Sequence, residues 1–82
     1  MNFEYYLKLQ KSGNLTSAEK GYKLLIKQNK VVNNLFTSLG LIYLKTNRAK
    51  TALKFFNKEL MINPLNTVAL NNLGLINIDL KN

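Results

Sequence analysis

A four-residue segment near the middle of the chain occurs a second time toward its end. Leu39-Gly40-Leu41-Ile42 returns as Leu73-Gly74-Leu75-Ile76. This offset matches the period of about 34 residues that is typical of a repeat built from two helices and a turn. Because one such unit cannot bury its own apolar face, units stack on their neighbours and often present a binding surface. The repeat therefore predicts a helical protein whose function is recognition.

The composition removes most of the chemistry that an enzyme of this size could use. The 82 residues include no cysteine and no histidine, so thiolate nucleophiles, the usual zinc ligands and the commonest general base at neutral pH are missing. The four acids stand apart, and no pair of them has a spacing that suggests acid–base work or metal binding. We therefore expect no enzymatic activity, no cofactor and no metal site.

The beginning of the chain and one long uncharged stretch bear on its location. Met1-Asn2-Phe3-Glu4 is not a basic segment followed by an apolar one, so we expect no secretory signal and a cytoplasmic location. No charge falls between Glu59 and Asp79, but this stretch contains Pro64 and five asparagines. Asparagine amides are costly in hydrocarbon, so no membrane span is expected there.

The net charge of +8 comes from eleven lysines and one arginine against four acids. Lysines at helical spacing fall on two segments, Lys20, Lys23, Lys27 and Lys30 on one and Lys50, Lys54 and Lys58 on the other. Two interpretations stay open: a solvated helix face, or an electrostatic site for nucleic acid, an acidic protein or an anionic membrane. With so little arginine and no exposed aromatic platform, nucleic-acid recognition is the less favoured outcome.

Apolar residues recur at helical spacing in five segments, which we place at residues 2–11, 16–29, 33–45, 48–61 and 67–80. Residues that tolerate a left-handed backbone, Gly13-Asn14 and Thr46-Asn47, mark tight turns between paired helices. Thr16 with Glu19 predicts a capping box at the start of the second segment. Asn63-Pro64 predicts the end of the fourth segment, and Asn66 a cap for the fifth.

Residues 33–66 resemble the tetratricopeptide repeat (TPR) family. The family pattern has a large apolar residue, then Leu-Gly, Tyr, Ala, Phe and a closing Pro. The matching residues here are Phe36, Leu39-Gly40, Tyr43, Ala52, Phe56 and Pro64. Gly40 and Ala52 are small enough to let paired helices approach closely, and Gly74 has the same expected role in the second copy.

The resemblance implies an all-α fold, a right-handed α-solenoid of antiparallel helix pairs with about two and a half repeats in one domain. Residues 1–32 form an atypical first repeat, with Tyr5-Tyr6 where Leu-Gly would lie. Residues 33–66 form a full repeat, and residues 67–82 supply the first helix of a third. That last helix is expected to be either a capping helix or part of a truncated repeat, with an apolar set exposed on it, namely Leu75, Ile76, Ile78 and Leu80.

In this family the first helix of each repeat lines a concave groove that holds extended peptides. The resemblance places Phe3 and Leu7 at this groove, together with Asp79 and the predicted partner-binding residues Asn34, Thr37, Ser38, Leu41, Lys45, Asn71, Asn72 and Leu75. Asn72 before Leu73-Gly74 is similar to the asparagine ladder of repeats in O-linked sugar transferases, in which amides grip a peptide backbone. The lysine-and-asparagine clamp of chaperone-binding members is largely missing, so tight binding of acidic C-terminal tails is not expected.

These observations predict a protein–protein interaction module, or scaffold, that holds a protein or peptide segment in the concave groove. Two alternatives stay open. The chain could be the N-terminal recognition arm of a larger enzyme, such as a glycosyl- or sulfotransferase with TPR repeats, or its basic convex surface could bind nucleic acid or an anionic membrane. Self-association through the last helix is a further expectation, because an uncapped stack exposes apolar surface.

Overall fold

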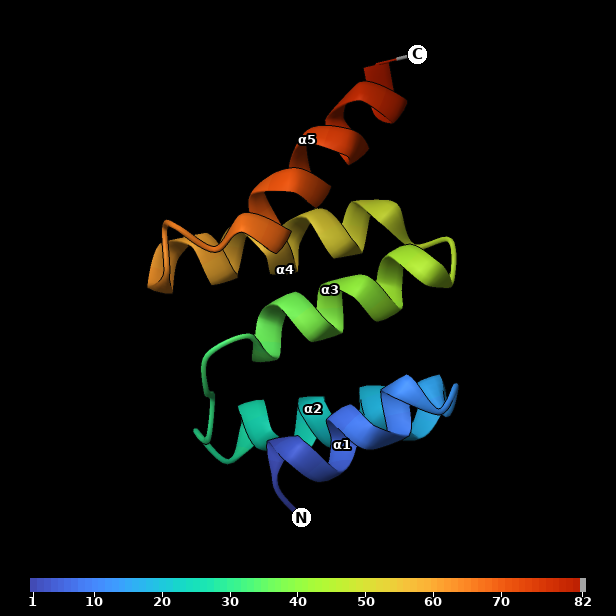
Figure 1. Cartoon of the computed structure of the whole chain (residues 1–82), viewed down its shortest axis with the longest axis vertical. Coiled ribbons are helices and arrows are strands. Elements are labelled where there is room, and N and C mark those ends of the chain that lie inside the picture. Colours follow the sequence, from blue (N-terminus) through green and yellow to red (C-terminus); the bar gives the residue numbers. More distant parts are fainter. Residues whose placement is uncertain (82) are drawn as a thin grey trace.

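The protein is all-helical over the part of the chain that its computed structural model describes. That part is residues 1–81, with the side chains of residues 79–81 excluded. It contains five helices and no strand: α1 (Phe3–Lys11), α2 (Leu15–Lys27), α3 (Leu35–Lys45), α4 (Ala49–Ile62) and α5 (Thr67–Lys81). Figure 1 shows the α1–α2 pair at one end of the longest dimension of a body of 39 × 25 × 19 Å, then α3 and α4, with α5 toward the other end. All five predicted helices are therefore present, with ends within two residues of their predicted positions.

Turn residues end the helices where the sequence predicted. Gly13, between α1 and α2, has a φ of 93°, and Asn47, between α3 and α4, has a φ of 61°. Both lie in the left-handed region that closes a helix hairpin. Helix α4 ends at Ile62, directly before Asn63-Pro64. The Asn66 side chain accepts a hydrogen bond from the Ala69 N–H at 2.9 Å, which confirms its role as the cap of α5.

The first hairpin, α1 with α2, closes through an aromatic ring that lies on a glycine. A Cβ atom at Gly21 would overlap the Tyr6 ring, so only glycine at this position lets α2 approach α1 so closely. Tyr6 also meets Tyr22 edge to face, with ring centroids 6.1 Å apart. The sequence pattern did not identify Gly21 as a packing residue, because the family motif has no glycine there.

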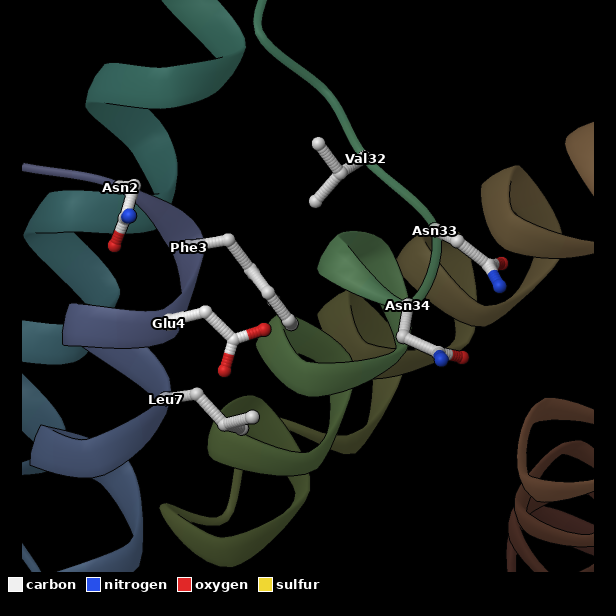
Figure 2. Close-up of a pocket in the computed structure, with 7 residues that line it drawn as sticks. All are labelled: Asn2, Phe3, Glu4, Leu7, Val32, Asn33 and Asn34. Carbon is white, nitrogen blue, oxygen red and sulfur yellow. The ribbon is translucent and has the colours of Figure 1, made fainter.

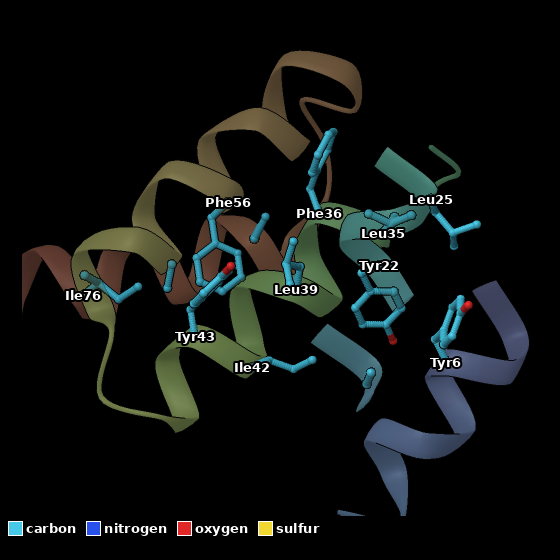
Figure 3. Packing of buried hydrophobic residues seen from close by; sticks show 13 residues of the cluster. Tyr6, Tyr22, Leu25, Leu35, Phe36, Leu39, Ile42, Tyr43, Phe56 and Ile76 are labelled. Atoms are coloured by element: carbon cyan, nitrogen blue, oxygen red, sulfur yellow. The ribbon is translucent and has the colours of Figure 1, made fainter. Parts of the chain in front are cut away.

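The second hairpin, α3 with α4, closes through Phe56 and Gly40; the sequence predicted a close approach at Gly40 but paired it with the small residue Ala52. A Cβ at Gly40 would lie 2.8 Å from the Phe56 ring, and Phe56 is fully buried. Figure 3 shows Phe56 of α4 pointing onto α3 beside Leu39 and Tyr43. Tyr43 stacks on Phe55 at 5.3 Å with an interplanar angle of 11°. The α3–α4 pair forms the centre of the apolar core.

Helix α5 packs against α4 but leaves one face open. Ala69 and Ile76 are buried against the core, whereas Leu75 and Ile78 are about 60% exposed. The prediction that Ile76 is exposed is therefore wrong, because it lies on the side of α5 that meets α4; the Leu80 side chain lies outside the described residues. Among the described residues, nothing lies within 4 Å of a Cβ built at Gly74, so these residues do not supply the predicted close contact at Gly74.

None of the helices within residues 1–81 combines the length and the hydropathy that a membrane crossing requires. The stretch from Glu59 to Asp79, which lacks charge, is instead divided between the end of α4, a loop and α5. Of its apolar residues, Ala69 and Ile76 belong to the buried core and Leu60 and Leu73 pack against it, whereas most of the others are exposed.

Candidate functional site

A pocket of about 560 Å³ opens where the starts of α1 and α3 meet. Its lining combines apolar side chains with one carboxylate and several carboxamide residues, and consists of Asn2, Phe3, Glu4, Leu7, Val32, Asn33 and Asn34. Figure 2 shows the Phe3 side chain reaching toward α3, while the amides of Asn33 and Asn34 point away from α1. The structure thus brings together three residues of the predicted groove, Phe3, Leu7 and Asn34.

A second pocket, of about 360 Å³, lies at the other ends of the same two helices. Gln10 from α1 lines it together with Leu41, Ile42, Leu44 and Lys45 from α3. The first pocket joins the starts of α1 and α3 and the second joins their ends, so the two helices run parallel. We call the surface that contains both pockets the α1–α3 groove, and define it by Phe3, Glu4, Leu7, Gln10, Leu41 and Lys45.

Two of the predicted partner-binding residues are inaccessible. Thr37 is 4% exposed and Ser38 is 7% exposed. Neighbouring helices cover them, since Glu59 of α4 accepts a hydrogen bond from the Thr37 N–H and Gln10 of α1 donates one to the Ser38 carbonyl. The expectation that both residues lie on the open face of the groove is corrected by their burial. Helical spacing placed them on the correct helix, but it could not show that α1 and α4 cover them.

The predicted partner-binding residues of α5 lie apart from both pockets. Asn71 and Leu75 are exposed, and neither lines a pocket at the junction of α1 and α3. The Asn72 amide donates to the Val68 carbonyl one turn earlier, at 2.8 Å, so its N–H is engaged within its own helix. The Asp79 side chain lies outside the described residues. Of the predicted groove, only residues from α1, from α3 and from the loop before α3 line these two pockets.

The Asn34 side chain joins two loops of the fold and does not point toward α1 across the pocket (Figure 2). Its φ of 73° places it in the left-handed region directly before α3. Its side-chain oxygen accepts a hydrogen bond of 2.6 Å from the Asn66 amide, which joins the loop before α3 to the loop before α5. The pocket therefore meets Asn34 mainly at its backbone side, while its amide is directed at Asn66.

A chain of hydrogen bonds fixes the floor of the groove. The Tyr22 hydroxyl donates to the Gln10 side-chain oxygen at 2.6 Å, and the Gln10 amide donates to the Ser38 carbonyl at 3.0 Å. Burial raises the pKa of the Tyr22 hydroxyl, so it remains a donor at neutral pH. Gln10 thereby links the first hairpin to α3, and it was not among the predicted site residues.

Glu19 joins the two hairpins on another side of the molecule. Its carboxylate accepts two hydrogen bonds from the Arg48 guanidinium, at 2.7 and 3.1 Å, and pairs with Lys23 at 3.0 Å. The Arg48 guanidinium also lies 4.4 Å from the centre of the Tyr43 ring. These contacts lower the pKa of Glu19 from its usual 4.5 to about 2, chiefly through the hydrogen bonds from Arg48.

The predicted capping box at Thr16 and Glu19 is therefore wrong. Helix α2 begins at Leu15, with Asn14 in the cap position and no side-chain capping bond. The local pattern of Thr followed by Glu was outweighed by a partner 29 residues away, since Arg48 offers a bidentate, charge-assisted contact.

Glu59 performs a capping role that the sequence did not reveal. It is 1% exposed, and its carboxylate accepts a 3.1 Å hydrogen bond from the Thr37 N–H, in the first turn of α3. Asn34 makes no side-chain cap to this helix, so a residue of α4 supplies a hydrogen-bond acceptor for one of the free N–H groups in its first turn. The Thr37 hydroxyl beside it is buried without a hydrogen-bond partner.

The remaining charged side chains do not assemble into a reactive cluster. Within the described residues, no three metal-ligating side chains come together. Six lysines of the two predicted sets are exposed on the surfaces of α2 and α4, and the seventh, Lys30, is exposed in the loop after α2. The Lys58 amine lies 5.8 Å from the ring centres of Phe36 and Phe55. The candidate site in the described part of the molecule therefore consists of the two pockets along α1 and α3.

Comparison with known proteins adds one relative. No protein-family profile matches the chain, and no solved structure matches it. The chain is 38% identical, over 80 residues, to a protein of Pyropia yezoensis named "Uncharacterized protein ycf37". The match covers 95% of this chain and 44% of the relative, so the chain spans less than half of that protein. The printed name of the relative states no activity, ligand or partner.

Proposed function

We propose that this chain is a protein–protein interaction module that binds an extended segment of a partner in the α1–α3 groove, without catalysis of its own. The observation that carries the proposal is the pair of pockets at the two ends of the junction between parallel helices α1 and α3. Each pocket takes residues from two hairpins, so the binding surface exists only when the hairpins are stacked.

Burial at several positions one repeat period apart supports a TPR-like solenoid, which in that family is right-handed, as the framework of this module. Ala18 and Ala52 are both fully buried, as are Tyr22 and Phe56. Ile42 and Ile76 are 1% and 2% exposed. Equal burial at equal spacing is what a repeated structural unit produces, because each unit meets its neighbour in the same way.

The chemistry of the groove favours a partner with both apolar and polar groups. Phe3, Leu7 and Leu41 supply apolar surface, with Glu4 near one end and Lys45 near the other. Helix α3 has 11 residues and is therefore about 16 Å long, which matches about five residues of extended peptide. A segment with a basic group at the Glu4 end and an acidic group at the Lys45 end would meet an opposite charge at both ends.

The test is selection of peptides from a random displayed library, followed by mapping of the bound peptide by amide chemical shifts. We expect the largest shifts at Phe3, Leu7, Leu41 and Lys45. The charge-reversing variants Glu4→Lys and Lys45→Glu should each weaken binding about tenfold, because both side chains are exposed and their replacement leaves the core intact.

Lys54→Glu is the matched control, since it makes the same charge change on the exposed surface of α4. Its affinity for the selected peptide should stay within about twofold of wild type. If the shifts map to the lysines of α2 and α4, or if Lys54→Glu weakens binding as much as Lys45→Glu, the groove is not the site.

A further inference from the structure

Three aromatic rings form a continuous row between α3 and α4. The rings of Tyr43 and Phe55 stack with their centroids 5.3 Å apart, and the Phe36 ring follows at 6.1 Å from Phe55. Phe55 belongs to α4 and is half-buried, whereas Tyr43 and Phe36 of α3 are 4% and 8% exposed. We call Tyr43, Phe55 and Phe36 the aromatic row.

Cations lie at both ends of the aromatic row. At the Tyr43 end, the Arg48 guanidinium lies 4.4 Å and the Lys23 amine 5.6 Å from the ring centre. Toward the other end, the Lys58 amine lies 5.8 Å from the centres of the other two rings. The side chains of Lys23 and Arg48 are 54% and 42% exposed, and Lys58 is exposed as well. A ligand can therefore reach all three cations.

The positive charge around the row is only partly neutralised. The Glu19 carboxylate pairs with both Arg48 and Lys23, so one negative charge serves two cations. Glu59, the other acid on α2 and α4, is 1% exposed and accepts a hydrogen bond from the Thr37 N–H, so it lies away from this surface. The same two helices carry four further exposed lysines, namely Lys20, Lys27, Lys50 and Lys54. The surface is positive at both ends of the row.

We infer that the surface of α2 and α4 around the aromatic row binds an acidic segment of a partner protein. One carboxylate of the segment lies at Lys23 and Arg48, where it meets the positive charge that Glu19 leaves uncompensated. A second carboxylate lies at Lys58. This surface is formed by different helix faces from those of the α1–α3 groove, so the inference goes beyond the proposed function.

The length of the row indicates the spacing of the two carboxylates. Phe36 and Tyr43 lie about two helical turns apart on α3, a distance of about 10 Å (Figure 3). Two side chains three residues apart in an extended segment are also about 10 Å apart. The segment that fits therefore has Asp or Glu at these two positions, with an apolar residue between them that contacts the half-buried Phe55.

The burial of the rings favours a polypeptide over a nucleic acid or a membrane. A base needs a ring face that is open to solvent, but Tyr43 is 4% exposed and carries Phe55 stacked on it. Insertion into lipid needs protruding apolar side chains, and Phe36 is 8% exposed. Lysine amines are compact charges that fit a carboxylate without bidentate geometry.

The probe is a labelled peptide with blocked ends that has two glutamates three residues apart and a leucine between them. We expect saturable binding to the 82-residue chain by fluorescence anisotropy, and weaker binding at higher salt because exposed charges are screened. A peptide of the same composition with adjacent glutamates cannot reach both ends of the row. It should bind about threefold more weakly or worse.

Charge variants at the two ends test the placement. Lys58→Glu reverses the charge at one end and should weaken binding of the probe about tenfold. Lys23→Gln removes one cation at the other end, leaves the pair of Arg48 with Glu19 in place, and should weaken binding about threefold. Lys8→Glu is the matched control for Lys58→Glu, since it makes the same charge change on the exposed surface of α1. It should bind the probe within about twofold of wild type.

Failure of the probe to bind wild type would overturn the inference. Equal weakening by Lys58→Glu and Lys8→Glu would also overturn it, because attraction would then depend on net charge alone. Lys45→Glu should leave binding of the probe unchanged, so the test is independent of the proposed function; if it abolishes binding, the peptide occupies the α1–α3 groove and the inference is wrong.

The same variants decide between classes of partner. Wild type and Lys58→Glu are compared for sedimentation with phosphatidylserine vesicles and for binding of a single-stranded oligonucleotide. If either ligand binds wild type more tightly than the probe does, and Lys58→Glu abolishes that binding, the occupant is a membrane or a nucleic acid and the inference is overturned. Weak binding of both ligands that Lys58→Glu leaves unchanged is the result expected for an acidic protein segment.

Discussion

The two hairpins of this chain solve the same packing problem with the large and small residues exchanged. In the first hairpin the first helix contributes the aromatic ring, Tyr6, and the second contributes the glycine, Gly21. In the second hairpin the first helix contributes Gly40 and the second contributes Phe56. A close helix contact requires a small residue opposite a large one, but it does not dictate which helix carries which.

The exchange places the two rings in different surroundings. Phe56 is fully buried in the centre of the stack, whereas Tyr6 is 8% exposed on the outermost hairpin. The exchange also accounts for Tyr5-Tyr6 at the position where the tetratricopeptide pattern, which residues 33–66 resemble, has Leu-Gly. Tyr6 stands one repeat period before Gly40, and the small residue that it needs is found in α2 instead.

Truncation of the two rings should give the largest difference in stability between the two hairpins. Phe56→Ala leaves a cavity in the centre of the core, and we expect it to lower the free energy of unfolding by about 3–5 kcal/mol. For a chain of this length such a loss approaches the whole stability. Tyr6→Ala should cost less, about 2 kcal/mol, because its site lies at the edge of the stack and can collapse. Urea denaturation followed by circular dichroism measures both.

A greater loss in Tyr6→Ala than in Phe56→Ala would show that the first hairpin, and not the second, holds the stack together. Leu24→Ala is a suitable control, since Leu24 is 45% exposed and its truncation should change the unfolding free energy little.

Alanine substitution at Gly21 and at Gly74 should change the stability of the fold in opposite directions. Gly21→Ala forces a methyl group against the Tyr6 ring, and we expect a loss of about 1–2 kcal/mol, since overpacking outweighs the gain in helix propensity. Gly74→Ala meets open space, so the gain in helix propensity should remain and raise stability by about 0.5–1 kcal/mol. Thermal unfolding of the two variants, side by side, gives the signs. Destabilisation by Gly74→Ala would contradict the open position of this residue.

The ion pair between Glu19 and Arg48, which joins the two hairpins, should have the smallest effect on stability, and this effect depends on pH. The pKa of Glu19 is about 2 when folded and 4.5 ordinarily, so its pairing with Arg48 stabilises the folded state fully above about pH 4.5. That contribution declines as the pH falls and is lost below about pH 2. Glu19→Gln should therefore be less stable than wild type at pH 7, and the difference should vanish toward pH 2. A difference that stays constant with pH would show that the charge of Glu19 does not contribute.

The positions of the helices could be predicted because their signals are local. The turn residues Gly13 and Asn47 need only their own backbone conformations, and Asn63-Pro64 ends α4 through sterics between neighbours in sequence. The close approach of α3 and α4 at Gly40 was also predictable, since the sequence pattern of residues 33–66 places a small residue there. At the site, Leu41 and Lys45 line the second pocket, and the resemblance to the repeat family had placed both at the groove.

The rest depended on contacts between residues distant in the chain. Gln10 reaches Ser38 from 28 residues away, and Glu59 reaches Thr37 from 22 residues away. Glu59 lies near the end of α4, and nothing in the local sequence distinguishes it from a glutamate that is exposed to solvent. The burial of Thr37 and the failure of the capping box at Glu19 follow from such partners, because tertiary hydrogen bonds decided both positions.

The hydrogen bond from the Tyr22 hydroxyl to Gln10 gives the groove an optical signal of its own. The chain contains no tryptophan and four tyrosines, so its near-ultraviolet emission comes from tyrosine alone. Tyr22 is fully buried and reaches the groove through its hydrogen bond to Gln10, which lines the second pocket, and through Phe3, whose ring centre lies 5.7 Å from that of Tyr22. A ligand that draws the Gln10 amide toward itself changes the environment of the Tyr22 phenol. Occupancy of the groove can therefore be followed by tyrosine fluorescence on the unlabelled protein, with Tyr22→Phe as the blank.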